Sequence, residues 1–394
     1  MNVIFLSPHF PNNSMEFCRY LNQFGVKVLG IGDADYNSIS DDLKHTLTEY
    51  YKVFDMEDYE QIFRAVGFFI QKYGKIDRFE SLNEYWLETE ARIRTDFNIY
   101  GTKMDFVFNL KQKSKMKYFF KKAGIKTARC LNSFSKTSAK EFIREIGYPV
   151  IVKPDIGAGA DMTYKINSDK EFDVFYRSKS PQVQFILEEY VDGVIYTYDG
   201  LIDRNGTVQF ADSQLFEHSV MDIVNTDDHL SYICLKDISP EVEKAGKKIL
   251  KAFDIRERFF HLEFFKSNID GQLYALEVNM RPPGAWMTDA INYSYDINIY
   301  EQWANLLVNN RVDIDKKCQG KYFTAFASRK NRKQYVHSHE EILKVYPDIK
   351  KHAVVEDIFS RAMGNYAYQY RAETLDEVRK FICFVQEETA DYCI

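Results

Sequence analysis

The sequence predicts a multidomain protein of mixed α/β and α+β class. In the first hundred residues, short apolar strands alternate with amphipathic helices, which is typical of a parallel sheet. The middle of the chain instead contains consecutive strands separated by turn signals, which is typical of an antiparallel sheet. The chain has 394 residues, of which 45% are hydrophobic, and this is enough for roughly two to four domains.

The N-terminal part begins with a βαβ pattern. The segment NVIFLSP is an apolar strand, SMEFCRYLNQFG is an amphipathic helix capped by Ser14, and KVLGIGD starts the next strand. The turn after the first strand reads SPHFPNNS and lacks the GxGxxG fingerprint of dinucleotide-binding folds. We therefore expect a Rossmann-like domain that is not a dinucleotide-dependent dehydrogenase.

A basic helix and a small-residue loop follow this domain. The segment QKSKMKYFFKKAGIKTA is a lysine-rich helix that ends at Gly124, and a solvated lysine face is its simplest interpretation. The next strand, YPVIVKPD, carries Lys153 where a buried strand normally avoids a charge. The loop IGAGADM then offers backbone amides that can approach phosphate oxygens. It is not a Walker A loop, because the chain has no GxxxxGK[ST] motif.

Antiparallel strands and a C-terminal α/β region complete the chain. Residues 184–218 alternate strands with the turn signals VDGV and DRNG. The segment SPEVEKAGKKILKAFDI is a helix with Pro240 in its first turn. Residues 318–394 contain the strands YFTAFASR and NYAYQYRA and the helices SHEEILKVYP and TLDEVRKFICFVQEE.

The hairpin HLEFFKSNIDGQLYALEVNMRPPG carries the chemistry that we consider most informative. Glu277 and Asn279 are two residues apart in a strand, so their side chains share one face, and Arg281 joins them if the strand continues. Glu263 on the neighbouring strand can lie opposite. Carboxylate and amide oxygens suit Mg²⁺ that is bound together with phosphates, and carboxylates are costly to bury without a cation. Edge-strand glutamates neutralised by lysines are the alternative.

The order of these features resembles the ATP-grasp superfamily. Lys113, Lys153 with its Gly/Ala loop, LEEYVDG, Glu263 and EVNMRPPG follow one another as in the carbamoyl-phosphate-synthetase-like and biotin-carboxylase-like carboxylate–amine ligases. The resemblance covers residues 1–315. The chain departs from the family pattern in two places: GVIY stands where an acidic residue often follows the DG turn, and Gln112 stands where an aspartate is usual.

The resemblance implies four structural units. These are a Rossmann-like pre-ATP-grasp domain over 1–105, an ATP-grasp small subdomain or lid over 106–190, a large subdomain with the Mg-ATP site over 191–315, and a small C-terminal α/β extension over 316–394.

The resemblance also implies roles for individual residues, with ATP and Mg²⁺ (or Mn²⁺) as cofactors. The ATP-binding residues would be Lys113, Lys153, Gly157, Ala158, Gly159, Ala160, Glu188, Glu189, Tyr190 and Val191. The metal ligands would be Glu263, Glu277 and Asn279. Arg281 and Lys153 would be catalytic, with Arg281 facing the transferred phosphate. His218, His261 and Trp286 are candidates for lining the substrate site. The loop over residues 156–162 is expected to close over the phosphates.

The implied function is an ATP-dependent ligase that activates a carboxylate as an acyl phosphate, couples it to an amine and releases ADP and phosphate. A stand-alone chain with one grasp unit most resembles bacterial L-amino-acid ligases, which make dipeptides or amino-acid conjugates; an aspartate–methionine type is one option. A biotin-carboxylase-like or carbamoyl-phosphate-like enzyme is an alternative. A non-catalytic ATP-binding regulatory protein is another, although the intact set of charged motif residues argues against it.

Composition limits the partners and the location. The formal net charge is −6, so a basic nucleic-acid footprint is lacking. No apolar stretch approaches the ~18 residues of a membrane span, and the N-terminus MNVIFLSPHF does not resemble a signal peptide. Six scattered cysteines without a CxxC motif favour reduced thiols in a cytoplasm. We expect small-molecule carboxylate and amine substrates, with a homodimer as an open option.

Overall fold

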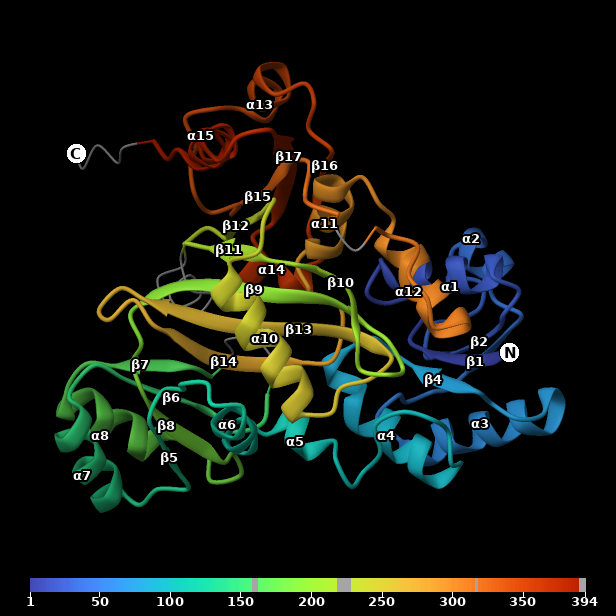
Figure 1. Ribbon diagram of the computed structural model, residues 1–394, viewed down its shortest axis with the longest axis horizontal. Coiled ribbons are helices and arrows are strands. Elements are labelled where there is room, and N and C mark those ends of the chain that lie inside the picture. Colours follow the sequence, from blue (N-terminus) through green and yellow to red (C-terminus); the bar gives the residue numbers. More distant parts are fainter. Residues whose placement is uncertain (158–161, 218–227, 316–317, 390–394) are drawn as a thin grey trace.

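The computed structural model describes residues 1–157, 162–217, 228–315 and 318–389 (Figure 1). Within these residues, the strands form an N-terminal parallel sheet, a small antiparallel sheet and a long antiparallel sheet that runs through the middle of the molecule. The mixed α/β and α+β class predicted from the sequence is confirmed.

The N-terminal sheet has the strand order β3-β2-β1-β4 and is parallel. Its strands are β1 (Asn2–Leu6), β2 (Lys27–Gly32), β3 (Glu49–Lys52) and β4 (Arg78–Glu80). Its helices are α1 (Ser14–Gln23), α2 (Asp41–Thr46), α3 (Tyr59–Tyr73) and α4 (Leu87–Asp96), with the short turn η1 (Glu84–Trp86) after β4. The predicted cap of α1 is wrong, because the helix already begins at Ser14, which is buried, and Asn13 is the N-cap.

The small sheet has the order β5-β8-β6-β7, with antiparallel pairs. Its strands are β5 (Cys130–Asn132), β6 (Val150–Pro154), β7 (Tyr164–Ile166) and β8 (Phe185–Glu189). The helices α7 (Lys136–Ile146) and α8 (Asp169–Ser178) cover one face, and the apolar side chains between them and the sheet form a separate core. α5 (Phe108–Lys111) and α6 (Lys113–Lys122) lead into this unit.

The long sheet has the order β14-β13-β9-β11-β12-β15-β17-β16, and β10 also pairs with β9. Its strands are β9 (Gly193–Ile202), β10 (Val208–Asp212), β11 (Gln214–Phe216), β12 (Ser231–Cys234), β13 (Arg258–Ser267), β14 (Leu273–Asn279), β15 (Phe323–Arg329), β16 (Lys351–Val354) and β17 (Tyr366–Ala372). The sheet therefore continues across the boundary predicted at residue 315, and the division into four units stays a prediction. β16 was not expected from the sequence.

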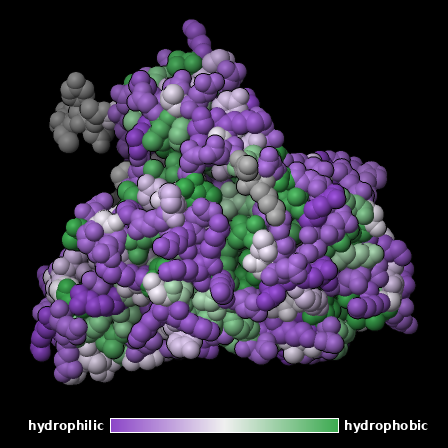
Figure 2. All heavy atoms as spheres, in the orientation of Figure 1, coloured by the Kyte–Doolittle hydropathy of each residue, from purple (hydrophilic) through white to green (hydrophobic). Residues whose placement is uncertain are grey.

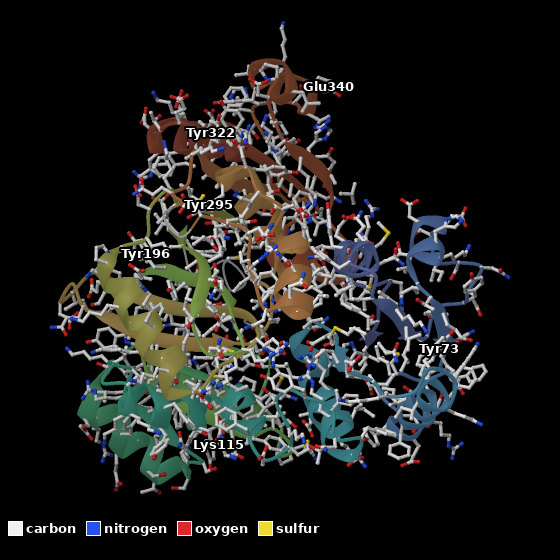
Figure 3. The ribbon with its side chains drawn as sticks, turned by 45° about the vertical axis from the view of Figure 1, so that its right-hand side comes forward. Tyr73, Lys115, Tyr196, Tyr295, Tyr322 and Glu340 are labelled. Carbon is white, nitrogen blue, oxygen red and sulfur yellow. The ribbon has the colours of Figure 1, made fainter. Side chains whose placement is uncertain are left out.

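Helices cover the long sheet. They are α10 (Pro240–Ala252), α11 (Met287–Tyr295), α12 (Ile299–Asn309), α13 (His339–Val345), α14 (Asp357–Met363) and α15 (Leu375–Gln386). α10 lies so close to β9 that a Cβ atom on Gly246 would be 2.2 Å from the ring of Tyr198. At the end of α11, Tyr295 packs edge-on against Phe210 with ring centroids 5.1 Å apart (Figure 3).

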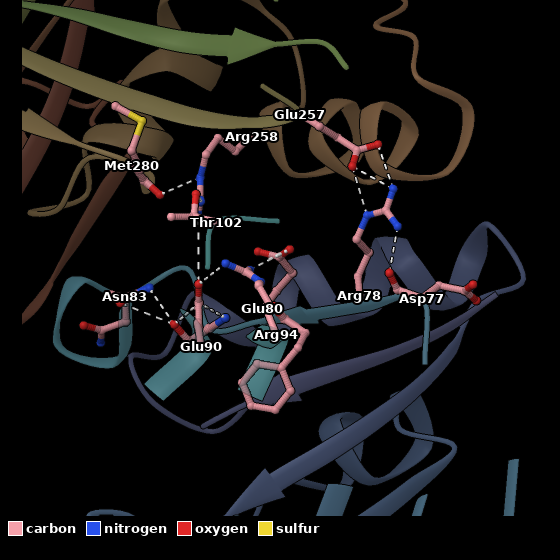
Figure 4. Close-up of polar contacts among 12 residues, drawn as sticks. Asp77, Arg78, Glu80, Asn83, Glu90, Arg94, Thr102, Glu257, Arg258 and Met280 are labelled. Atoms are coloured by element: carbon pink, nitrogen blue, oxygen red, sulfur yellow. Dashed lines mark hydrogen bonds and ion pairs between the residues drawn. The ribbon is translucent and has the colours of Figure 1, made fainter. Parts of the chain in front are cut away.

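Buried ion pairs join the N-terminal domain to the start of β13 (Figure 4). Arg78 reaches Glu257 at 2.7 Å, and Arg258 lies 3.9 Å from Glu90. Within the N-terminal domain, Arg94 lies 3.0 Å from both Glu80 and Glu90. Arg258 donates to the carbonyl oxygen of Met280 at 3.1 Å. These charges pair with one another or with backbone groups, which offsets the cost of burying them. β4 is thereby held beside the β13–β14 hairpin.

The visible surface of the molecule is mostly hydrophilic. Figure 2 shows a mostly hydrophilic face, with the visible hydrophobic side chains gathered mainly toward its middle. Among the described residues, no helix combines the length and apolar character that a membrane span requires. The cysteines of the described residues are unpaired, namely Cys18, Cys130, Cys234, Cys318 and Cys383.

Candidate active site

A pocket of about 190 Å³ lies between the small sheet and the β13–β14 hairpin. It brings together most of the site residues predicted from the sequence. These are Lys113, Lys153, Glu188, Glu189, Tyr190, Val191, Glu263, Glu277 and Arg281. Apolar side chains complete the lining, namely Ile151, Ile195, Phe265 and Leu276. The pocket thus combines apolar walls with a dense group of charges.

Two lysines from different elements converge on Glu188. Lys153 on β6 lies 2.8 Å from Glu188 on β8, and Lys117 on α6 lies 2.9 Å from its other oxygen. Burial acts to raise the pKa of Glu188, but Lys117 and Lys153 outweigh it and lower this pKa to about 2. Glu188 is therefore ionised and holds both ammonium groups at the pocket.

Lys117 was not predicted, because the lysines of α6 other than Lys113 were interpreted as a solvated face. Lys113 and Lys117 are four residues apart, so they lie on the same face of the helix. That face points into the pocket, and the side chain of Lys117 is 17% exposed. The four-residue spacing from Lys113 was the signal that could have identified it.

Lys113 links three parts of the site. Its ammonium group donates to the carbonyl oxygen of Gly157 at 2.6 Å and lies 3.1 Å from Glu277. Burial acts to lower the pKa of Lys113, but Glu277 outweighs it and the pKa is raised. Next to it, Gln112 donates to Asp155 at 2.7 Å. Gln112, where the family usually has an aspartate, therefore ties the start of α6 to the end of β6.

The three predicted metal ligands lie on one face of the hairpin. Glu263 is directly opposite Glu277, and Asn279 is opposite His261. Burial raises the pKa of Glu277, and Lys113 opposes this only in part. Burial acts to raise the pKa of Glu263 as well, but the contact with His261 outweighs burial and the pKa of Glu263 is lowered. Two partly buried carboxylates and a buried amide form a hard oxygen donor set, so these residues fit Mg²⁺ or Mn²⁺.

Arg281 is held by the N-terminal domain. Its Nη2 donates to Glu84 at 2.9 Å and its Nε to the same oxygen at 3.3 Å. Glu84 belongs to η1, directly after β4. The sequence analysis missed Glu84, because nothing in the segment NEYW shows that it meets a residue almost 200 positions later.

His261 and Trp286 do not line this pocket. His261 lies between Asp199 at 2.6 Å and Glu263 at 3.0 Å. Burial acts to lower the pKa of His261, but Asp199 and Glu263 raise it to about 10. Both ring nitrogens face carboxylate oxygens, which accept hydrogen bonds when they are ionised. The ring of Trp286, at the start of α11, packs under the ammonium group of Lys351, 4.2 Å from the ring centroid.

Some predicted residues lie outside the described part of the chain. Ala158, Gly159, Ala160 and His218 belong to the ranges 158–161 and 218–227. Their assigned roles, and the expected closure of the loop over residues 156–162, stay predictions.

Comparisons with known proteins identify a domain family for the central part of the chain. Residues 146–289 match the model of the ATP-grasp domain. The L-arginine-specific L-amino acid ligase of Bacillus subtilis is 24% identical over 272 residues, which are 67% of this chain and 65% of that relative. The carbamoyl phosphate synthase large chain of Agathobacter rectalis is 24% identical over 200 residues, which are 49% of this chain and 18% of that relative. The aligned part thus spans less than two thirds of each relative.

Solved structures show the same fold over nearly the whole chain. An L-amino acid ligase from Bacillus licheniformis superimposes with a TM-score of 0.75 at 17% identity and covers 97% of this chain and 95% of its own. N5-Carboxyaminoimidazole synthetase from Staphylococcus aureus, complexed with ADP, has a TM-score of 0.72 at 15% identity and covers 96% of this chain and 95% of its own. Residues 146–289 therefore contain an ATP-grasp domain, and the whole chain has the fold of these ligases. The resemblance to the ATP-grasp family predicted from the sequence is confirmed, and the likeness to ligases supports the enzyme class that is proposed below.

Proposed function

We propose that the protein is an ATP-dependent ligase that activates a substrate carboxylate as an acyl phosphate and couples it to an amine, releasing ADP and phosphate. One observation carries the proposal: Lys113, Lys153 and Arg281 converge with Glu263 and Glu277 around one pocket. Phosphoryl transfer to a carboxylate requires positioning and neutralisation of negative charge above all. The pocket supplies these without a protein nucleophile.

The cationic side chains have distinct tasks in this proposal. Lys113 and Lys153 neutralise the phosphates of ATP, and Lys117 joins them because it shares Glu188 with Lys153. Arg281, oriented by Glu84, faces the transferred phosphate and the carboxylate substrate. The apolar walls suit the flat adenine ring, and Glu188 to Val191 lie where they can contact adenine and ribose.

Glu263, Glu277 and Asn279 would hold Mg²⁺ or Mn²⁺. When bound, the metal ion neutralises charge on the transferring phosphate. The support is the donor set itself. The side chain of Glu277 is only 14% exposed, and among the described residues Lys113 is the one cation within ion-pair distance of it. A bound cation would therefore stabilise the ionised form of this carboxylate.

We further propose that the substrates are amino acids and that the product is a dipeptide or an amino-acid conjugate. The likeness to the L-arginine-specific L-amino acid ligase and to the Bacillus licheniformis L-amino acid ligase supports this choice. A carbamoyl-phosphate-like or biotin-carboxylase-like reaction is the alternative, and the likeness to carbamoyl phosphate synthase supports it. A cytoplasmic location and a homodimer belong to the proposal.

The test is a screen of phosphate release from ATP with pairs of amino acids, followed by mass spectrometry of the products. Aspartate with methionine is one pair in the matrix. We expect release that depends on two substrates together and a product whose mass is their sum minus water. Phosphate release that requires bicarbonate instead would support the alternative. No release with any pair, despite ATP binding, would support a regulatory protein.

A further inference from the structure

A row of polar side chains crosses three adjacent strands beside the proposed metal site. Asp199 on β9 is opposite His261 on β13, which is opposite Asn279 on β14. Two residues along β13, Glu263 has Thr197 and Glu277 as its neighbours on the same two strands. Because side chains two residues apart in a strand share a face, these residues form one continuous polar surface.

His261 is the centre of this row and is 4% exposed. Its Nδ1 lies 2.6 Å from Asp199 Oδ1, and its Nε2 lies 3.0 Å from Glu263 Oε1. Both contacts are within hydrogen-bond range, so the imidazole bridges two carboxylates. The ring has no contact with the pocket itself, and therefore substrate lining is not its role.

The far end of the bridge is also fixed. Asp199 is fully buried and its second oxygen accepts a hydrogen bond from Thr197 Oγ1 at 2.6 Å. The Thr197 hydroxyl oxygen in turn accepts from the backbone nitrogen of Gln214 at 2.9 Å. Asp199 thus has hydrogen-bond partners at both of its carboxylate oxygens, which fixes the orientation of the carboxylate that faces His261.

We propose that His261, oriented by Asp199, is a positioning residue for the metal ligand Glu263. The inference rests on the proposed function, in which Glu263 binds Mg²⁺ or Mn²⁺. His261 holds Oε1 of Glu263 and thereby fixes the rotation of the carboxylate, which leaves Oε2 for the metal ion. Hydrogen-bonding partners of metal ligands contribute to metal affinity in this way, and their loss typically weakens binding by about 10–100-fold.

A pair of substitutions separates this role from a packing role. In His261→Gln, the side-chain amide nitrogen takes the approximate place of Nε2 and can still donate to Glu263. In His261→Asn, the amide group takes the approximate place of Nδ1, so it can contact Asp199 but not Glu263. Both variants lose the ring, and they differ in the contact that the proposal requires.

We would measure the affinity for Mn²⁺ in the presence of ADP, using electron paramagnetic resonance to detect the free Mn²⁺. We expect His261→Asn to weaken Mn²⁺ binding by about 10-fold or more, and His261→Gln to weaken it clearly less. Binding of ADP without metal should be unchanged in both. His339→Asn is the control. His339, at the start of α13 and away from the pocket, makes a comparable hydrogen bond of 2.9 Å with Tyr368 on β17.

Wild-type Mn²⁺ affinity in His261→Asn would overturn the inference. Equal losses in the two variants would also overturn it, because a role in packing alone predicts equal losses. If the wild-type protein itself did not bind Mn²⁺ with ADP, the proposed metal site would fail and this inference with it. Normal wild-type binding together with insensitive variants would overturn the inference alone and leave the proposed function standing.

Discussion

Arg281, two residues beyond the end of β14, forms an ion pair with Glu84 of the N-terminal domain, with 2.9 Å between Arg281 Nη2 and the Glu84 carboxylate. The two residues are 197 positions apart. The side chain of Glu84 is 13% exposed and that of Arg281 is 20% exposed, so the pair is largely shielded from water. The proposed phosphate-facing guanidinium is therefore oriented by a domain that does not contribute the other charged groups of the pocket.

Glu84→Gln should reduce kcat/KM for the carboxylate substrate by about 10-fold or more, because a hydrogen bond to a charged group contributes roughly 1.5–3 kcal/mol. The affinity for ADP should stay unchanged. Steady-state kinetics with varied carboxylate checks this. Glu88→Gln is the matched control, since Glu88 pairs with Lys111 at 3.1 Å and its side chain is 49% exposed. Equal effects of the two substitutions would contradict a specific role for Glu84.

Glu277→Gln should abolish ligation while the fold stays intact, because the change preserves side-chain volume and removes the negative charge that we propose binds the metal ion. Wild-type activity should likewise disappear in EDTA and return with Mg²⁺ or Mn²⁺. Product formation and far-UV circular dichroism are the measurements. A variant that keeps near-normal turnover, or a wild-type rate that survives EDTA, would remove Glu277 from the metal site.

The ion pairs of Glu188 should make the free energy of unfolding depend on pH in the acid range. Its pKa in the folded protein is about 2, below the ordinary value of 4.5. The ionised form therefore contributes stability that is fully present above pH 4.5 and is lost as the pH falls toward 2. The contribution is on the order of 3 kcal/mol. Chemical denaturation of the wild type and Glu188→Gln across this range measures it.

The variant should be less stable than the wild type at pH 7, because Lys117 and Lys153 lose their shared partner. The difference between the two proteins should shrink below pH 4.5. A difference that stayed constant down to pH 2 would contradict the assignment of this ion pair.

Glu257 should contribute strongly to stability, because it connects the N-terminal domain to β13. Its side chain is 1% exposed and pairs with both Arg78 and Arg204. Glu257→Gln should lower the free energy of unfolding by about 3–5 kcal/mol, because it leaves guanidinium groups without their counter-charge. Asp254→Asn, at a pair whose aspartate is 74% exposed, should cost less than about 1 kcal/mol. Urea denaturation of both variants tests the contrast.

The proposed acyl-phosphate intermediate can be tested by chemical trapping. If an acyl phosphate forms, hydroxylamine should capture it as a hydroxamate, and ATP should be converted to ADP and phosphate. Colorimetric detection of the hydroxamate and chromatography of the nucleotides are the measurements. Production of AMP and pyrophosphate would indicate an adenylating mechanism instead.

The hairpin could be predicted from the sequence because its signal is local. Strand periodicity alone places Glu277 and Asn279 on one face, and a single turn brings Glu263 opposite. The fold class followed from the same kind of signal, since the change from alternating helices and strands to consecutive strands is visible within short windows.

The partners of these residues could not be predicted, because tertiary packing sets them. Asp199 meets His261 across 62 positions of sequence, and Glu84 meets Arg281 across 197. Lys117 was taken for a solvent-exposed lysine because helix periodicity shows which residues share a face but not what covers that face. β16 was missed because its four residues, Lys351 to Val354, are intermediate or exposed and carry no apolar alternation.

Because the long sheet is continuous, the strands of the C-terminal region belong to the same sheet as the strands of the pocket. β12 lies between β11 and β15, and β15 lies between β12 and β17. A chain cut after residue 315 would leave β12 with a row of unpaired backbone donors and acceptors along one side. Such an open edge is a template for pairing with another chain. A shortened protein that keeps every charged residue of the pocket would therefore be prone to aggregate rather than to fold as a smaller stable unit.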